Sequence, residues 1–541
     1  MSSFDLVVVG ATPGGITTAL AAARRGHSVL LLERSAHIGG LPANGLGATD
    51  IGTRGATAGL FLEFVNRIKQ HYVQTYGPDS QQVKDSSDGY HFEPHIAEKI
   101  FLAMLAEHPR ITTKTLRQFD ADKSNLALTG DRLTTITVTN RETNTTETYT
   151  GQFFIDATYE GDLAAAAGVP YTTRREGFAE FHEPMSGKIY KPWGGPPADG
   201  STGEGDDTLQ AYNYRLCLTD DPAIRVTIQK PAAYNREEFA SLADDIRLTR
   251  YAGTFTKERH FNPPGIGRIT NQVILPNHKT DSNNQHLAFI STDLPEENYP
   301  WPTADWAWRD RFADRLRSYT LGLLYFAQND PALPEDFRQR CAAWGLARDE
   351  YIDNANFPRQ VYVREGRRIV GRHLFTAHDA LPTDGKDGRP PIHADSITAS
   401  HYALDSHAHH KREPGRAHLD GFFSFSTKPC TVPYGVIVPK SGPTNLLCPV
   451  PVSGTHVGFS TLRMEPCWMA LGQAAGIAAS LALTQKTTAA SVAIADLQNA
   501  LLDSGAVLIY FQDASPADPN FKDLQRAALR GEIKNWHARQ R

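Results

Sequence analysis

The order of elements within residues 5–33 constrains the fold of this chain more than any other feature. The pattern predicts a short buried strand, a glycine-rich turn, a helix, a second buried strand and an acidic residue, at positions 5–9, 10–15, 16–25, 28–32 and Glu33. Parallel strands that alternate with helices in this order are typical of dinucleotide-binding folds. Glu33 can accept hydrogen bonds from both hydroxyls of a ribose and would repel a 2′-phosphate. The chain is therefore expected to be an α/β protein that binds a nucleotide.

Glycines stand in the turn where the chain must bend sharply or approach a ligand closely. Gly10 permits the turn after the strand, and Gly14 and Gly15 permit close contact with a pyrophosphate and a neighbouring strand. Pro13 has no N–H group and suits the first turn of a helix, whose N-terminus favours phosphate. The middle glycine of the usual G-x-G-x-x-G pattern is Thr12 here. A plain strand–helix–strand unit without a nucleotide is the alternative.

The overall composition is that of an ordinary globular protein. Hydrophobic residues make up 40% of the 541 residues, and the net charge of −5 indicates no basic surface for nucleic acid. No apolar run is expected to reach the roughly 20 residues of a membrane span, and no signal peptide is recognised. Five scattered cysteines without a CxxC pair favour a reducing compartment and disfavour a metal site. A cytoplasmic protein with no bound metal and no nucleic-acid or membrane partner is expected.

The pattern of elements predicts a first α/β part, a large insertion and a C-terminal return to the first part. Alternating strands around 111–155 and amphipathic helices belong to the first part. The insertion is less regular and richer in Pro, Gly, Trp and Tyr. A strand at 445–447 and a small-residue helix from about Pro466 to Leu483 mark the return. The expected divisions are a first domain part, an inserted substrate domain, the return and a helical C-terminal segment, at 1–168, 169–430, 431–485 and 486–541.

Motifs along most of the chain resemble those of one flavoprotein class. GATPGGI begins at Gly10, HIGG at His37 and GLGATD at Gly45. Further matches are IDATYEGD, YNYRLCLT, LPNHKTDSNN, YVREGRRIVG, HYALDSH and SGTHVGFSTLRMEP…MALGQAAG, from 155, 212, 275, 362, 401 and 453. Together they resemble the FAD-dependent oxidoreductases of the glutathione-reductase-like class, in a subfamily marked by GATPxGI, HIGG and GLGATD. The resemblance implies a Rossmann-like FAD-binding domain with a large inserted α+β substrate domain.

The same resemblance implies which residues contact FAD. The pyrophosphate, adenosine ribose and ribitol would be held by Gly10, Pro13, Gly14, Gly15, Glu33, Arg34, Gly39 and Gly40. The isoalloxazine ring and the adenine side would be contacted by Leu46, Gly47, Thr49, Ala157, Thr158, Gly472, Gln473 and Ala474. Close helix packing is the alternative for the last three, because glycine and alanine let backbones approach. Cys448-Pro-Val-Pro451 departs from the family pattern, in which an Ala-Gly-Arg-like stretch often follows the strand at 445–447.

Histidines and arginines late in the chain are the candidates for catalysis. The segment 401–407 ends at His407, and Asp405 can orient its ring for proton transfer. His456 is a second candidate base, with a buried histidine bonded to backbone as the alternative. Arg463 and Arg367 are candidates to stabilise developing negative charge. An internal salt-bridge network is the alternative for the arginines at 364–368, because Glu365 lies among them.

The expected function is an FAD-dependent oxidoreductase, either an oxidase or a dehydrogenase, that removes hydride from a small organic substrate through flavin N5. Alternatives are a flavin monooxygenase supplied by an external reductant, a non-catalytic FAD-bound protein and an NAD-dependent dehydrogenase with a single Rossmann unit. No second glycine-rich strand–turn–helix unit appears, so no built-in NAD(P)H domain is expected. Electrons would pass to O₂ or an external carrier. The sequence specifies neither the substrate nor the oligomeric state.

Overall fold

The computed structural model describes residues 2–191, 195–248, 263–383 and 388–539. Its main sheet has the strand order β3-β2-β1-β7-β6-β4, with β5 on β6 and β19 on the end of β7. The strands are β1 Ser2–Val9, β2 Val29–Leu32, β3 Ile111–Lys114, β4 Arg117–Gln118, β5 Leu126–Thr129, β6 Arg132–Asn140, β7 Thr145–Asp156 and β19 Leu446–Leu447. β3, β2, β1, β7 and β19 run parallel, and β6 runs antiparallel to β7. The expected α/β class and the parallel Rossmann-type sheet are confirmed.

The register of β1 explains why its sequence is apolar. Val7 pairs with Leu30 of β2 on one side and with Phe154 of β7 on the other. A strand with neighbours on both edges and helices on both faces is buried throughout, so it carries a continuous apolar run. β19 joins the parallel sheet at Phe154, which brings residues near 446 beside the N-terminal unit.

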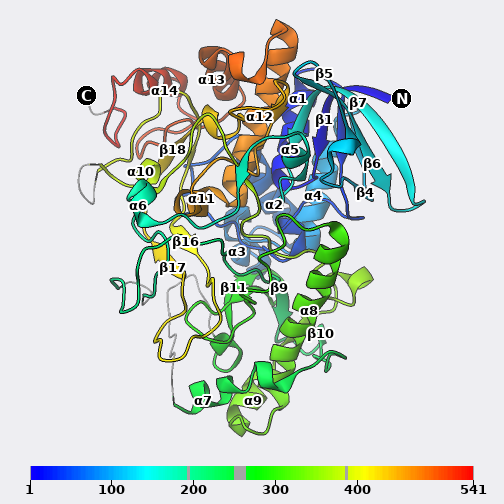
Figure 1. Cartoon of the computed structure of the whole chain (residues 1–541), viewed down its shortest axis with the longest axis vertical. Coiled ribbons are helices and arrows are strands. Elements are labelled where there is room, and N and C mark those ends of the chain that lie inside the picture. The colour runs from blue at the N-terminus through cyan, green and yellow to red at the C-terminus, as the bar shows by residue number, and fades with distance from the viewer. Residues whose placement is uncertain (1, 192–194, 249–262, 384–387, 540–541) are drawn as a thin grey trace.

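Two helices from opposite ends of the chain pack closely against each other over this sheet. They are α1, Pro13–Arg24, and α12, Glu465–Gln485 (Figure 1). A Cβ added at Gly472 would lie 2.0 Å from the carbonyl oxygen of Gly14, and the Thr18 hydroxyl donates to the Gly472 carbonyl at 3.0 Å. Gly472 therefore lies in the contact between the two helices, as the packing alternative expects.

A second sheet lies in the lower half of the molecule (Figure 1). It is antiparallel, with the order β10-β13-β9-β12-β11. Its elements are β9 Leu216–Thr219, β10 Arg225–Val226, β11 Thr270–Leu275, β12 Lys279–Asn284 and β13 Gly345–Ala347, with α7 Ser241–Arg247, α8 Trp306–Asn329 and α9 Glu335–Ala342 nearby in the chain. All of them fall inside the predicted insertion, whose boundaries remain predictions.

Short elements and further helices complete the fold. The helices are α2 Leu60–Tyr76, α3 Gln81–Asp85, α4 Pro94–Ala106, α5 Asp162–Ala166, α6 Phe178–Phe181, α10 Ala377–Ala380, α11 His456–Leu462, α13 Ile494–Asp503 and α14 Phe521–Leu529. The strands are β8 Tyr171–Thr172, β14 Arg368–Ile369, β15 Ser396–Ser400, β16 Leu404–Ser406, β17 Phe423–Phe425 and β18 Cys430–Pro433. β15 pairs with β18 and packs against α12. This part of the predicted insertion therefore contacts a helix that packs over the main sheet.

One helix is long and apolar enough to cross a membrane by length and composition. It is α12, with a mean hydropathy of 1.4 in its most apolar window. The expectation that no segment reaches this length was therefore wrong. In the structure 83% of that window is buried, as is usual for the core helix of a globular fold.

Candidate active site

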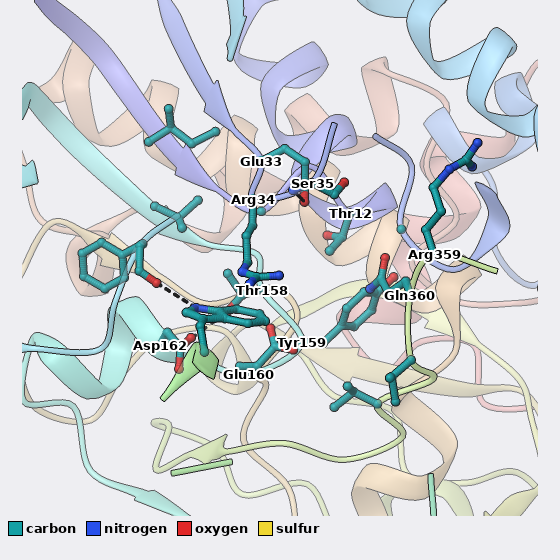
Figure 2. Close-up of a pocket in the computed structure, with 18 of the residues that line it drawn as sticks. Thr12, Glu33, Arg34, Ser35, Thr158, Tyr159, Glu160, Asp162, Arg359 and Gln360 are labelled. Carbon is teal, nitrogen blue, oxygen red and sulfur yellow. Dashed lines mark hydrogen bonds between the residues drawn. The ribbon is translucent and has the colours of Figure 1, made fainter. Parts of the chain in front are cut away.

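A pocket lies where the carboxyl ends of β1, β2 and β7 meet the loops that follow them (Figure 2). It holds about 970 Å³ of space free of atoms, part of it open to solvent. Ligands of open α/β sheets bind at this edge, beyond the carboxyl ends of the strands. This strand-end pocket is lined by five residues expected at the cofactor, namely Gly10, Glu33, Arg34, Gly40 and Thr158.

The turn between β1 and α1 forms one wall of the pocket. Gly10 has a φ of +98°, and a Cβ added there would lie 2.7 Å from the Ala157 carbonyl oxygen. Thr12 is the N-cap of α1: its hydroxyl oxygen accepts from the Gly15 amide at 3.2 Å and donates to the Ala157 carbonyl at 2.8 Å. The cap contact explains a threonine where the usual pattern has its middle glycine. The N-terminus of α1 thus begins at the pocket wall, where its dipole favours an anion.

Glu33 lies in the pocket at the end of β2 (Figure 2). Its Oε2 accepts from the Ala11 amide at 3.0 Å, and its Oε1 accepts from the Ser35 amide at 2.8 Å. Burial raises the pKa of Glu33 above its ordinary value, although these amides act in the opposite direction. Each carboxylate oxygen keeps a second acceptor site, so the side chain is fixed in position and still able to receive hydroxyl donors.

Arg34 closes one end of the pocket through contacts that the sequence did not indicate. Its guanidinium lies 4.0 Å from the ring centroid of Trp306 and pairs with Asp310 at 2.7 Å. The Trp306 indole N–H donates to the Phe119 carbonyl at 3.1 Å, and its ring is thereby held in the wall. The Arg309 guanidinium also lies 4.6 Å from the Trp306 centroid, so cations already stack on the indole, and the planar guanidinium of Arg34 is the group on which a base could stack.

Tyr159 and Glu465 form a buried pair near the other side of the glycine turn. The Tyr159 hydroxyl donates to Glu465 Oε1 at 2.5 Å and accepts from the Leu41 amide at 3.1 Å. Glu465 is the first residue of α12, and burial raises its pKa to about 8. Its Oε2 is buried without a hydrogen-bond partner among the described residues. A buried polar atom of this kind is costly unless a ligand satisfies it.

A separate group of buried charged side chains surrounds His407. Asp293 Oδ2 lies 2.8 Å from His407 Nδ1, and the opposite ring nitrogen, Nε2, lies 3.6 Å from Asp405 Oδ2. Arg364 pairs with Asp293 at 2.9 Å, and Arg463 pairs with Asp405 at 3.1 Å. These five residues are called the His407 cluster below. The structure thus brings together His407 and Arg463, two of the four predicted catalytic residues.

Charges within the His407 cluster determine the protonation of its two carboxylates. Burial acts to raise the pKa of Asp293, but Arg364 and His407 outweigh it, and the pKa lies below its ordinary value. At Asp405, burial also acts to raise the pKa, but His407 and Arg463 outweigh it, and this pKa is lowered as well. Both carboxylates are therefore ionised on either side of the imidazole. Such an arrangement orients the ring between two negative charges.

Asp50, Arg215 and Tyr362 extend this polar region. Arg463 donates to the Tyr362 hydroxyl at 3.0 Å, and Arg215 lies 3.6 Å from Asp50. Burial raises the pKa of Asp50 to about 6, against the opposing charge of Arg215. Asp50 ends the GLGATD motif, so the sequence carried a signal for this residue, although it was not among the predicted site residues.

His456 lies beside the His407 cluster but has a partner on each ring nitrogen. Nδ1 lies 2.8 Å from Glu365 Oε2, and Nε2 lies 3.1 Å from the Ser406 hydroxyl. Its backbone N–H, at the start of α11, donates to Glu176. Burial acts to raise the pKa of Glu365, but His456 and Arg368 lower it to about 2. The ring is held by side chains, and not by the backbone contact considered from the sequence.

Arg367 lies away from the His407 cluster. Its guanidinium pairs with Asp162 at 2.6 Å, and Arg309 pairs with the same carboxylate at 2.6 Å. Asp162 lines the strand-end pocket, so Arg367 supports the pocket floor from behind. The contacts of Arg367 are those of an internal salt-bridge network, the alternative given above for the arginines at 364–368.

The remaining predicted residues are not part of the pocket lining. Gln473 accepts from the Leu60 amide at 2.8 Å and donates to Ser504, and Thr49 donates to the Tyr90 carbonyl. The other members are buried or make close backbone packing, and they are Pro13, Gly14, Gly15, Gly39, Leu46, Gly47, Ala157, Gly472 and Ala474.

Comparison with known proteins identifies the family. A model of the family described as FAD dependent oxidoreductase matches residues 5–501. The chain belongs to this family. It is an enzyme, and its cofactor is FAD. A search of curated protein sequences gave no match.

The solved structures that match parts of this FAD-dependent oxidoreductase are distant from it. p-Nitrophenol 4-monooxygenase from Pseudomonas putida is 10% identical with a TM-score of 0.30, over 69% of this chain and 70% of that one. Anhydrotetracycline hydroxylase from Streptomyces rimosus is 16% identical with a TM-score of 0.22, over 32% and 35%. 3-Ketosteroid-Δ4-(5α)-dehydrogenase from Rhodococcus jostii is 14% identical with a TM-score of 0.20, over 31% and 50%. The chain matches 70% of the monooxygenase but only half or less of the other two proteins, and these likenesses do not define the reaction.

The strand-end pocket fits FAD on structural grounds. It adjoins the glycine turn and the N-terminus of α1, and it contains Glu33. Nearby, Glu465 Oε2 is buried and lacks a partner among the described residues. A phosphate-binding helix terminus, a ribose acceptor and an unsatisfied buried carboxyl oxygen are features that a bound dinucleotide would use.

Proposed function

We propose that this enzyme removes hydride from a small organic substrate and passes the electrons to O₂ or an external carrier. When bound, FAD accepts two electrons from a substrate as a hydride. The helix N-terminus at Gly14, the carboxylate of Glu33 and the guanidinium of Arg34 would hold it in the strand-end pocket. Ala157 and Thr158, at the end of β7, would complete the wall behind the turn.

The Asp293–His407 contact carries this proposal. Asp293 is ionised, so His407 Nδ1 donates to it, and Nε2 is the ring atom that could exchange a proton with a substrate. Asp405 lies 3.6 Å from Nε2, too far for a hydrogen bond and close enough to stabilise a positive charge. His407 is thereby arranged to take a proton from a substrate O–H or N–H group as the neighbouring C–H bond loses hydride.

Arg463 and Tyr362 are placed to stabilise negative charge that develops on the substrate. Arg463 is 2% exposed, so its charge acts in a poorly solvated environment where electrostatic interactions are strong. Its contacts with Asp405 and Tyr362 fix the guanidinium in place. Asp50, with its raised pKa, is a second group able to hold a proton near this region.

The test is anaerobic reduction of the bound flavin by a panel of small alcohols, hydroxy acids and amines. With a substrate that reduces the wild type, His407→Asn is expected to slow reduction by about 10²- to 10⁴-fold, the usual contribution of a general base. His401→Asn is the matched control, because His401 belongs to the same motif but bonds to Thr53 instead. Unchanged reduction by His407→Asn, with slowing by His456→Asn, would contradict the assignment of the base.

A monooxygenase supplied by an external reductant remains the second reaction to test. Oxygen uptake that depends on added reduced nicotinamide, without flavin reduction by any member of the panel, would favour it. Flavin that neither a substrate nor a reductant reduces would instead support a non-catalytic FAD-bound protein.

A further inference from the structure

Two histidines and an aspartate converge at a place outside the strand-end pocket and the His407 cluster. His373 Nε2 and His393 Nε2 lie 3.3 Å and 2.9 Å from the same oxygen, Oδ1 of Asp379. The three ligand atoms all lie within 4.8 Å of one another. His373 follows β14, Asp379 is on α10 and His393 precedes β15, so three separate segments meet here.

The second oxygen of Asp379 is already used, which leaves Oδ1 for the histidines. Oδ2 accepts from the Thr376 amide at 2.7 Å and from the Thr376 hydroxyl at 3.0 Å. These bonds cap α10 and hold the carboxylate in a fixed orientation. Hydrogen bonds that orient a ligating carboxylate in this way are typical of metal sites.

The tautomer of His393 is determined by Thr431. The Thr431 hydroxyl donates to the Pro391 carbonyl at 3.1 Å, so its oxygen acts as acceptor for the His393 amide at 3.0 Å and for His393 Nδ1 at 2.8 Å. With the proton on Nδ1, a neutral ring presents a bare lone pair at Nε2. That lone pair faces a carboxylate oxygen at 2.9 Å, a contact that requires either a proton or a cation between the two atoms.

One divalent cation satisfies the three groups better than protons do. Protonating both rings would place two positive charges beside a single carboxylate, with ring centroids 5.2 Å apart. Tetrahedral zinc with bonds of about 2.0–2.1 Å separates its ligand atoms by about 3.3 Å, close to the distances found here. Two imidazoles and a carboxylate are a donor set that zinc-type transition metals accept.

Two other groups of acids and histidines in the described residues already have a positively charged side chain beside their carboxylates. Lys279 Nζ lies between Glu93 and Glu350, at 2.6 Å and 2.9 Å, so an ammonium already provides the cation there. The third group is Asp206, His410 and Asp420, and the guanidinium of Arg175 pairs with both of its carboxylates. In the part of the chain that the structure describes, Asp379 pairs with no lysine or arginine.

We propose that His373, Asp379 and His393 bind one zinc-type divalent transition-metal ion, with water completing its coordination. The side chains are 13% to 32% exposed, so the ion is reachable from solvent. The ion would join the loop around α10 to the β15–β18 pair. Glu183 connects this loop to α11, because it accepts from the Ala377 amide and from Thr455, the N-cap of α11. The expected role is therefore to stabilise the region that carries His456.

The test is calorimetric titration of the full-length, flavin-loaded protein with Zn²⁺ after removal of metals with a chelator. The wild type is expected to bind one Zn²⁺ per chain and to melt at a higher temperature with Zn²⁺ than without. His373→Gln and His393→Gln are each expected to weaken binding by at least roughly 100-fold, and Thr431→Val by roughly 10-fold, as loss of an orienting partner does. His378→Gln, on the same helix but outside the group, is the matched control and should bind as the wild type does.

A second measurement requires no variant. The X-ray absorption spectrum of Zn²⁺ bound to the wild type should show imidazole nitrogen together with oxygen ligands. An oxygen-only shell, absence of saturable Zn²⁺ binding, or unchanged binding by the double variant H373Q/H393Q would overturn the proposal.

Discussion

Asp293 Oδ2 lies 2.8 Å from Nδ1 of His407, and both side chains are buried. The two residues are 114 positions apart, so only the tertiary fold brings them together. Their contact orients the imidazole, as Glu365 orients that of His456. The two rings differ at Nε2, which lies 3.1 Å from the Ser406 hydroxyl in His456 and 3.6 Å from Asp405 in His407.

Replacement of Asp293 by Asn tests this relationship. An amide can donate to Nδ1 and thereby favour the wrong tautomer, so flavin reduction by a substrate is expected to slow by about 10³- to 10⁴-fold, as in other oriented histidines. Substrate affinity should change little. Stopped-flow reduction at several pH values gives both the rate of flavin reduction and the substrate affinity. A variant with the wild-type rate and pH profile would rule out a role for the Asp293–His407 contact in catalysis.

Glu465 is expected to make stability depend on pH. Its pKa is about 8 in the folded protein and 4.5 in a model compound, so between these values the unfolded chain loses a proton that the folded protein keeps. The free energy of unfolding therefore falls as pH rises through this range. Glu465→Gln should remove this contribution. Between pH 5 and pH 8 its free energy of unfolding should therefore fall by about 1 to 3 kcal/mol less than that of the wild type.

The measurement is urea unfolding of the FAD-free protein at pH 5 and pH 8. Glu335→Gln, at the exposed start of α9, should retain the wild-type decline. If the free energy of unfolding of Glu465→Gln fell as steeply with pH as that of the wild type, the raised pKa of Glu465 would be disproved.

Gly472→Ala tests whether the small residues of α12 serve packing. An added Cβ would meet the Gly14 carbonyl oxygen at 2.0 Å, so α1 and α12 must separate. A loss of about 1 to 3 kcal/mol in the free energy of unfolding is expected in protein without FAD. Thr484→Ala, on the exposed end of the same helix, should change it by less than about 0.5 kcal/mol. Normal stability with loss of FAD alone would favour a flavin contact instead.

Arg367→Met separates a structural from a catalytic role for this arginine. Asp162 would keep Arg309 but lose one of its two buried partners, so the expected cost is about 2 to 3 kcal/mol of stability. Flavin reduction in the folded variant should stay within a few fold of the wild type. Arg340→Met, which breaks an exposed pair on α9, is the control for stability. A stable variant with greatly slowed reduction would make Arg367 part of the reaction.

The sequence predicted those parts of the site that local order specifies. The turn at Gly10 and the acid at Glu33 belong to one continuous strand–turn–helix–strand unit, so their pattern was sufficient to place them at the pocket. Asp293 and Trp306 carry no comparable local signal, because each reaches the site only through the fold of the intervening chain. Gly472 was ambiguous, since small residues in a helix permit both close packing and contact with a ligand, and only coordinates show which surface they face.

Binding of FAD to wild type and Glu33→Ala tests the central claim most directly, namely that the strand-end pocket holds the cofactor. FAD released from the purified full-length protein should amount to one molecule per chain, and titration of the stripped protein should quench flavin fluorescence at that ratio. Glu33→Ala should fold but bind FAD more weakly by about 10-fold or more, because a carboxyl acceptor held in place for the ribose is lost. A wild type that neither contains nor takes up FAD, or a variant with unchanged affinity, would contradict the account.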